Sequence, residues 1–143
     1  MDTGANFPGM TRPEGQSRSQ VEAVVRSQYA RLRADPVVGR LFAQFEPGGE
    51  HEARIADFWW AGFGGTPAQP RSFDMLARHR ALGLTEQAFE IWFVHLQAAV
   101  DEHLNPEQAG RWMKRAREIG AQLKRYTLGG EHPARLVPIG GRT

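Results

Sequence analysis

The sequence predicts a single-domain, all-α protein, and three observations lead to this prediction. Apolar residues recur three and four positions apart along several long segments, which is the spacing of one face of an α-helix. No segment alternates apolar and polar residues over the length of a strand. The chain has 143 residues, of which 41% are hydrophobic, so its length suits one domain and its composition is that of a globular protein.

The first helix is expected to begin near Ser19 and to end before Pro36. Ser19 and Glu22 have the spacing of a capping box, in which each side chain accepts from the other residue's backbone N–H. Pro36 ends the helix because the residue before a proline disfavours helical dihedral angles. A short turn is expected over 37–45. The predicted buried face of the first helix consists of Val21, Val24, Val25, Tyr29 and Leu32.

A second main helix is expected over 50–63, and a shorter one over 73–80. The Gly-Gly-Thr-Pro stretch at 64–67 ends the second helix, and Gly83 ends the short one. The face of the second helix that is expected to point inward consists of His51, Ile55, Phe58 and Gly62, with Trp59 beside it. The short helix brings together Met75, Leu76 and His79.

Two further helices are expected in the last third of the chain. Thr85 is the predicted N-cap of a helix that runs to about Leu104, and Asn105, Pro106 and Gln108 form a capping box that begins the next one. The apolar face of the former consists of Phe89, Trp92, Phe93, Leu96 and Val100. That of the latter consists of Ala109, Trp112, Met113, Ala116, Ile119, Gly120 and Leu123.

The two ends of the chain carry Gly and Pro without helical periodicity. Residues 1–16 are therefore expected to form a flexible arm, 17–128 the folded domain and 129–143 a flexible tail. The N-terminus lacks the features of a secretory signal, and no apolar run is long enough to span a bilayer. We expect a cytoplasmic protein, monomeric or weakly dimeric, that binds neither membranes nor nucleic acid, since the formal net charge is only +2.

The absence of cysteine and the spacing of the five histidines exclude several kinds of site. Without cysteine there is no disulfide, no thiolate nucleophile and no iron–sulfur cluster. No His pair has the spacing of a zinc protease, and no Glu-x-x-His motif of a di-iron bundle occurs. What remains is a helical domain with single histidines on apolar faces. Such a histidine is either an ordinary core residue or a haem ligand, because one imidazole suffices to hold haem iron.

Three stretches of the chain resemble a known family. They are His51-Glu-Ala-Arg54-Ile-Ala-Asp-Phe58-Trp59 with the later His79, Phe89-Glu-Ile-Trp92, and the opening helix and bend Tyr29-Ala-Arg-Leu-Arg33-Ala-Asp35-Pro-Val-Val-Gly39-Arg-Leu-Phe42. Together, and in this order, they resemble the truncated haemoglobins, and most closely the third group of that family. The resemblance covers roughly residues 19–126.

The resemblance implies a shortened globin fold, a two-over-two helical sandwich around haem b. It implies that His79 is the proximal ligand of the haem iron, and that Arg54 contacts a haem propionate. The distal side, where a diatomic ligand binds, would contain Tyr29, His51 and Trp92. The apolar wall of the haem pocket would consist of Phe42, Phe45, Phe58, Trp59 and Leu76; the sequence leaves open whether Trp59 or its neighbour Trp60 faces the haem.

The function implied by this resemblance is the binding of O₂, or of related diatomics such as NO and CO, at a pentacoordinate haem iron. A phenol and an indole N–H on the distal side can both donate hydrogen bonds to bound O₂. Two alternatives stay open. One is a haem enzyme that performs NO dioxygenation or peroxide reduction with a reductase as partner, and the other is a non-haem helical interaction module.

Overall fold

The computed structural model describes residues 15–66 and 84–127, and all regular structure in these two ranges is helical. The predicted short helix over 73–80 therefore lies outside the described residues. The helices are α1 (Arg18–Ala34), α2 (Gly39–Phe42), α3 (Glu50–Gly62), α5 (Glu86–His103) and α6 (Pro106–Thr127). Short loops connect α2 to α3 and α5 to α6.

The start of α1 differs from the prediction by two residues. Ser17, and not Ser19, is the N-cap: the backbone N–H of Gln20 donates to Ser17 Oγ at 3.1 Å, and that of Ser17 donates to Gln20 Oε1 at 2.9 Å. Both serines have an acceptor three residues later, so the capping pattern alone does not choose between them. Tertiary packing favours the earlier start, because Gln16 is buried and the carbonyl of Gly15 accepts from Gln108 of α6.

The end of α1 is as the sequence predicts, and the segment expected as a short turn over 37–45 contains the short helix α2. Asp35 caps the helix before Pro36, and its Oδ1 accepts from the backbone N–H groups of Val37 and Val38. Gly39 then passes so close to α1 that a Cβ atom there would lie 2.7 Å from the carbonyl oxygen of Arg33. Only glycine allows this approach, which brings the segment after α2 back alongside α1.

The prediction for the inward face of α3 is wrong by about one position. His51, Ile55 and Phe58 are only partly buried. The buried residues of the helix are Glu52, Ala56, Asp57, Trp59 and Trp60. Two of these are carboxylates, which hydropathy assigns to the solvent, and both are neutralised by arginines of α1. Buried carboxylates require such partners, so the two ion pairs allow this face, which also carries Trp59 and Trp60, to be buried.

The last two helices and their caps confirm the prediction. Thr85 Oγ1 accepts from the backbone N–H of Ala88, and Asn105 and Gln108 form the expected capping box at the start of α6. Every residue of the predicted α6 face is buried. Trp112 is fully buried, and its ring centroid lies 5.1 Å from that of Trp59 in α3. This contact joins the C-terminal helix to α3 in the centre of the core.

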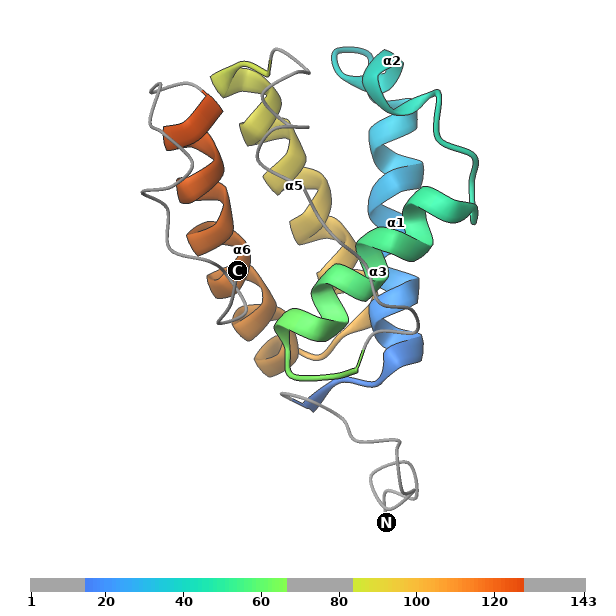
Figure 1. Cartoon of the computed structure of the whole chain (residues 1–143), viewed down its shortest axis with the longest axis vertical. Helices are drawn as coiled ribbons and strands as arrows, with labels where there is room; N and C mark the ends of the chain where they lie inside the picture. Colours follow the sequence, from blue (N-terminus) through green and yellow to red (C-terminus); the bar gives the residue numbers. More distant parts are fainter. Residues whose placement is uncertain (1–14, 67–83, 128–143) are drawn as a thin grey trace.

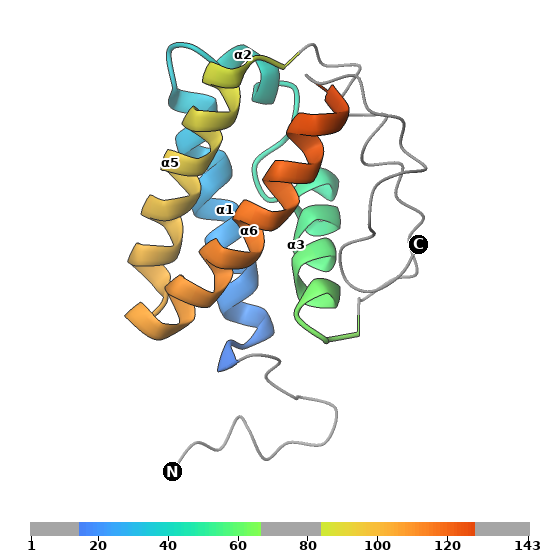
Figure 2. The same ribbon diagram turned by 90° about the vertical axis from the view of Figure 1, so that its left-hand side faces the viewer.

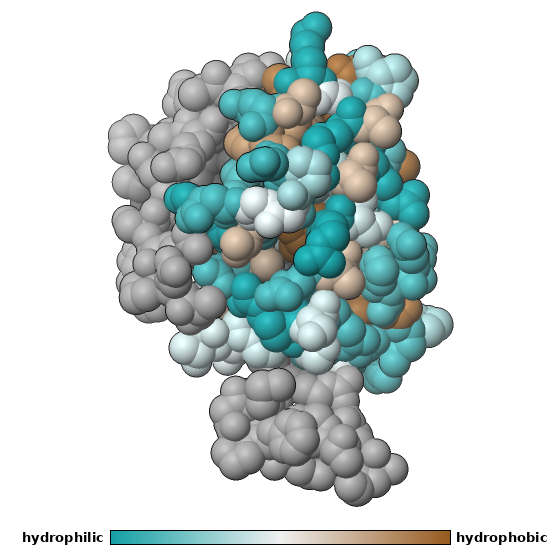
Figure 3. Space-filling view, turned by 90° about the vertical axis from the view of Figure 1, so that its right-hand side faces the viewer, coloured by the Kyte–Doolittle hydropathy of each residue, from teal (hydrophilic) through white to brown (hydrophobic). Residues whose placement is uncertain are grey.

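The helices form two layers of two. Figure 1 shows α1 crossing α3 and, beside them, α5 and α6 as an antiparallel pair; Figure 2 shows α5 and α6 in front of α1 and α3. Helix α1 contacts both α3 and α5, and α5 contacts α6. Figure 3 shows a face on which hydrophilic side chains predominate, with apolar ones scattered between them. Within the described ranges, no helix has the length and apolar character needed to cross a membrane.

Candidate functional site

Tyr29 of α1 and His51 of α3 meet where these two helices pack together. Tyr29 Oη lies 3.1 Å from His51 Nε2, a hydrogen-bond distance, and the two rings meet edge to face with centroids 5.4 Å apart. Tyr29 is 5% exposed, whereas His51 is only partly buried. The structure therefore brings together two of the three residues predicted for the distal side, which are 22 positions apart in the chain.

Two of the three phenylalanines predicted for the pocket wall, Phe42 and Phe45, frame this pair. Phe45 stacks on His51 with centroids 3.7 Å apart and planes 11° from parallel. Phe42 meets Tyr29 edge to face at 5.4 Å and lies 6.5 Å from Phe45. Both phenylalanines pack against the core and stay partly exposed. Each polar ring of the pair thus has an aromatic neighbour that fixes its orientation.

The phenol of Tyr29 remains protonated far above neutral pH. Burial raises the pKa of Tyr29 well above its usual range, and the nearby charge of Glu52 raises it further, while Arg33 partly opposes this. A neutral phenol keeps its O–H donor, and its oxygen also accepts. Tyr29 can therefore donate to a ligand while it accepts a hydrogen bond from His51.

Two charged residues that the sequence analysis did not select lie beside the pair. Arg33 Nη1 donates to Glu52 Oε2 at 3.0 Å and to the carbonyl oxygen of Phe45 at 3.3 Å. Both side chains are largely buried. The nearest hint in the sequence is that Glu52 follows His51 directly and that Arg33 follows Tyr29 by one turn. Hydropathy alone assigns both to the solvent.

Trp92 is the third residue predicted for the distal side. Its side chain is partly buried and packs against the core. Its ring meets that of Phe93 edge to face, with centroids 5.2 Å apart. Its backbone carbonyl accepts from Gln28 Nε2 at 3.4 Å, so α5 passes α1 beside the residue that precedes Tyr29. This places the backbone of Trp92 next to the Tyr29 region; a role for its indole N–H stays a prediction.

The other predicted pocket residues of α3 differ in their surroundings. Arg54 is partly exposed and its Nη2 lies 3.5 Å from Glu50 Oε2, an ion pair along the helix. Phe58 is partly buried and meets Trp59 edge to face. Trp59 and Trp60 are both buried; Trp59 packs against Phe63 and Trp112, within the core between α3 and α6. The predicted ligand His79 and its neighbour Leu76 lie outside the described residues.

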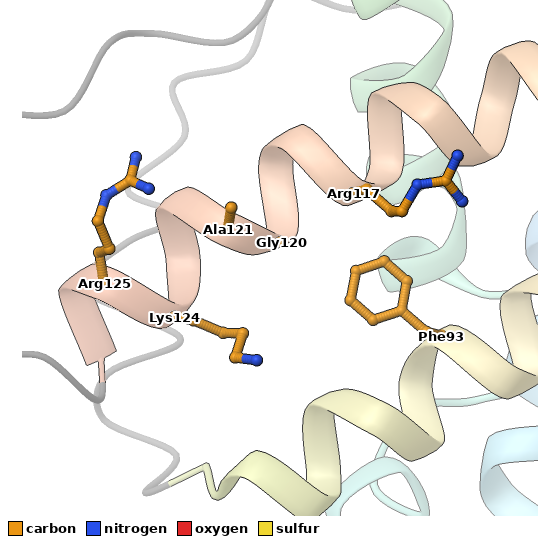
Figure 4. A pocket seen from close by; sticks show the side chains of 6 residues that line it. All are labelled: Phe93, Arg117, Gly120, Ala121, Lys124 and Arg125. Atoms are coloured by element: carbon orange, nitrogen blue, oxygen red, sulfur yellow. The ribbon is translucent and has the colours of Figure 1, made fainter.

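A separate open hollow lies between α5 and α6. Figure 4 shows Phe93 of α5 opposite Arg117 of α6, with two more cationic side chains further along α6. One of these, Lys124, has its Nζ 3.5 Å from Glu86 Oε2. The lining consists of Phe93, Arg117, Gly120, Ala121, Lys124 and Arg125. None of the residues predicted for the ligand site is among them.

Comparisons with known proteins give the family. The sequence model of the bacterial-like globins matches residues 15–123. A solved structure, the group III truncated hemoglobin from Campylobacter jejuni, is similar to this chain with a TM-score of 0.68 and 19% sequence identity, over 85% of this chain and 99% of that one. No curated protein sequence matches the chain. The chain belongs to the bacterial-like globin family and has the shortened, two-over-two globin fold.

Proposed function

We propose that the protein holds haem b through His79 and binds O₂ or a related diatomic reversibly on the side of Tyr29 and His51. The globin family implies a haem cofactor, which favours this function over a non-haem interaction module. The observation that carries the proposal is the Tyr29–His51 contact at 3.1 Å, framed by Phe45 and Phe42. It is a polar pair within an apolar, aromatic setting, as a ligand pocket requires.

The residues described fit a haem group. Several large apolar side chains pack against the core and yet stay partly exposed, as expected for the wall of a pocket for a flat apolar ligand. They include Phe42, Phe45, Ile55, Phe58 and Trp92. When bound, the haem supplies a ferrous iron at which diatomic ligands bind. His79 would hold the iron, and Arg54 would pair with a propionate.

The distal pair would act through the direction of its hydrogen bond. When His51 carries its proton on Nε2, it donates to Tyr29 Oη, and the phenol hydrogen is then available to a ligand. When Nε2 is unprotonated, Tyr29 donates to His51 instead. A polar diatomic ligand favours the first arrangement because it accepts the phenol hydrogen. Such a donor stabilises bound O₂ and slows its release.

Absorption spectroscopy of the purified protein tests the proposal. We expect a Soret band, a ferrous spectrum typical of a pentacoordinate haem, and reversible changes on adding O₂ and CO. A protein that carries no haem, and takes up none when it is supplied, would contradict the proposal. NO or peroxide turnover measured with a reductant distinguishes a binding protein from an enzyme, because the same distal donors serve both.

A further inference from the structure

Arg33 is linked to the Tyr29–His51 pair through the segments that carry the two rings. On α1 it lies one turn after Tyr29. Its Nη1 donates to the carbonyl oxygen of Phe45, whose ring stacks on His51. The same Nη1 donates to Glu52, which follows His51 in α3. The guanidinium therefore fixes both segments that hold the imidazole, the one that stacks on it and the one that carries it.

We infer that Arg33 and Glu52 are positioning residues, which hold the imidazole of His51 at hydrogen-bond distance from Tyr29. The inference rests on the proposed function, because it gives the pair its role in ligand binding. Neither residue needs to touch the ligand. They act through the stack of Phe45 on His51 and through the spacing of α1 and α3.

Burial makes this contact rigid. The side chains of Arg33 and Glu52 are 17% and 6% exposed. Charge-assisted hydrogen bonds are stronger than neutral ones, and a buried carboxylate that loses its partner must either move or draw in water. The ion pair lies near enough to Tyr29 to act on its phenol: the charge of Glu52 raises the pKa of Tyr29, and that of Arg33 lowers it. A substitution of either residue is therefore expected to alter the hydrogen bond between Tyr29 and His51.

A second ion pair between the same two helices provides the control. Arg18 Nη1 lies 2.8 Å from Asp57 Oδ1, and the side chain of Asp57 is 2% exposed. Like Glu52, Asp57 is a buried carboxylate of α3 held by an arginine of α1. Arg18 precedes Tyr29 by 11 residues, about 16 Å along the helix. Loss of this ion pair weakens the packing of α1 on α3 without touching the segment at Phe45.

The test compares Glu52→Gln with Asp57→Asn in the full-length protein as purified. Two quantities are measured: the ¹⁵N NMR signal of the His51 ring, and the rate of O₂ release by stopped flow. We expect Glu52→Gln to shift the His51 signal and to speed O₂ release about threefold to tenfold, the effect of one lost hydrogen bond. Asp57→Asn should lower the melting temperature but leave both quantities unchanged. Arg33→Lys, which keeps the charge, should give an intermediate result.

The outcomes separate this inference from the proposed function. If Glu52→Gln and Asp57→Asn lower the melting temperature alike and neither moves the His51 signal, the positioning role is wrong. If Glu52→Gln does not fold, Arg33→Lys is compared with Asp57→Asn instead, and an unmoved His51 signal again shows that the positioning role is wrong. If the His51 signal moves while O₂ release stays constant, the positioning role stands, and the proposed action of the pair on the ligand is wrong.

Discussion

The imidazole of His51 lies almost flat on the ring of Phe45, with centroids 3.7 Å apart and planes 11° from parallel. The stack fixes the plane of the imidazole and leaves Nε2, at the edge of the ring, within 3.1 Å of the hydroxyl of Tyr29. An apolar side chain thus sets the direction of a polar one.

Loss of either predicted distal donor should speed the release of O₂. Tyr29→Phe and Trp92→Phe remove a hydrogen-bond donor and keep most of the ring. Each bond contributes about 0.5–1.5 kcal/mol, so each variant should release O₂ roughly threefold to tenfold faster. CO release should change less, because bound CO carries less negative charge on its outer atom. Stopped-flow measurement of O₂ and CO dissociation checks both.

The control for these variants is Trp112→Phe, a core substitution between α3 and α6. It should lower stability and leave the ratio of O₂ to CO release unchanged. His51→Ala should speed O₂ release as Glu52→Gln does, because both remove the hydrogen bond that orients the phenol of Tyr29. It should also speed ligand association, because the partly buried imidazole can gate entry. Unchanged O₂ release in both Phe variants would mean that Tyr29 and Trp92 are ordinary core residues.

His79→Ala should abolish stable haem retention. A ligand that binds only the folded state stabilises it by mass action, about 2.7 kcal/mol at a hundred times its Kd, so the melting temperature should fall as well. His103→Ala, at the exposed end of α5, is the matched control and should keep its haem. Full haem content and an unchanged ferrous spectrum in His79→Ala would show that another residue holds the iron.

Asp35 should make stability depend on pH in the acid range. His95 Nε2 lies 2.8 Å from Asp35 Oδ2, and this hydrogen bond, with those from the backbone of Val37 and Val38, lowers the pKa of Asp35. A carboxyl whose pKa is lower in the folded state stabilises the fold above its unfolded pKa, near 3.9. The contribution is lost as pH falls through the lower, folded value.

Melting temperatures of Asp35→Asn and of the original protein should therefore differ most near neutral pH and converge below about pH 4. His95→Asn should reduce the same difference, because it removes the largest cause of the shift. Asp101→Asn on the exposed side of α5 is the control. A difference between Asp35→Asn and the original protein that stays constant from neutral pH down to pH 3 would contradict this account.

Two glycine substitutions should have opposite effects on stability. Gly39→Ala places a Cβ atom 2.7 Å from the backbone oxygen of Arg33, which cannot rotate away, so we expect a loss of about 1–3 kcal/mol. Gly110→Ala in α6 meets nothing within 4 Å and should gain up to about 1 kcal/mol from helix propensity. Urea unfolding of both variants checks the signs. Equal effects would show that the turn after α1 relaxes freely.

The sequence by itself determined the long helices that the structure describes and most of their ends. Periodicity and capping residues act within one or two turns, so the cap at Thr85, the capping box at Asn105 and the stop before Pro36 could be predicted without tertiary information. The buried face of α6 was predicted for the same reason. The order of short motifs also pointed to the family, which the comparisons confirmed.

Only the tertiary structure decided which side chains meet. Hydropathy assigns Glu52 and Asp57 to the solvent. In the structure both are buried, because α1 supplies Arg33 and Arg18 as their partners across the interface. The distance from Tyr29 to His51 likewise depends on how α1 crosses α3. Helix crossing is fixed by contacts between residues far apart in the chain, and these contacts leave no periodic pattern in the sequence.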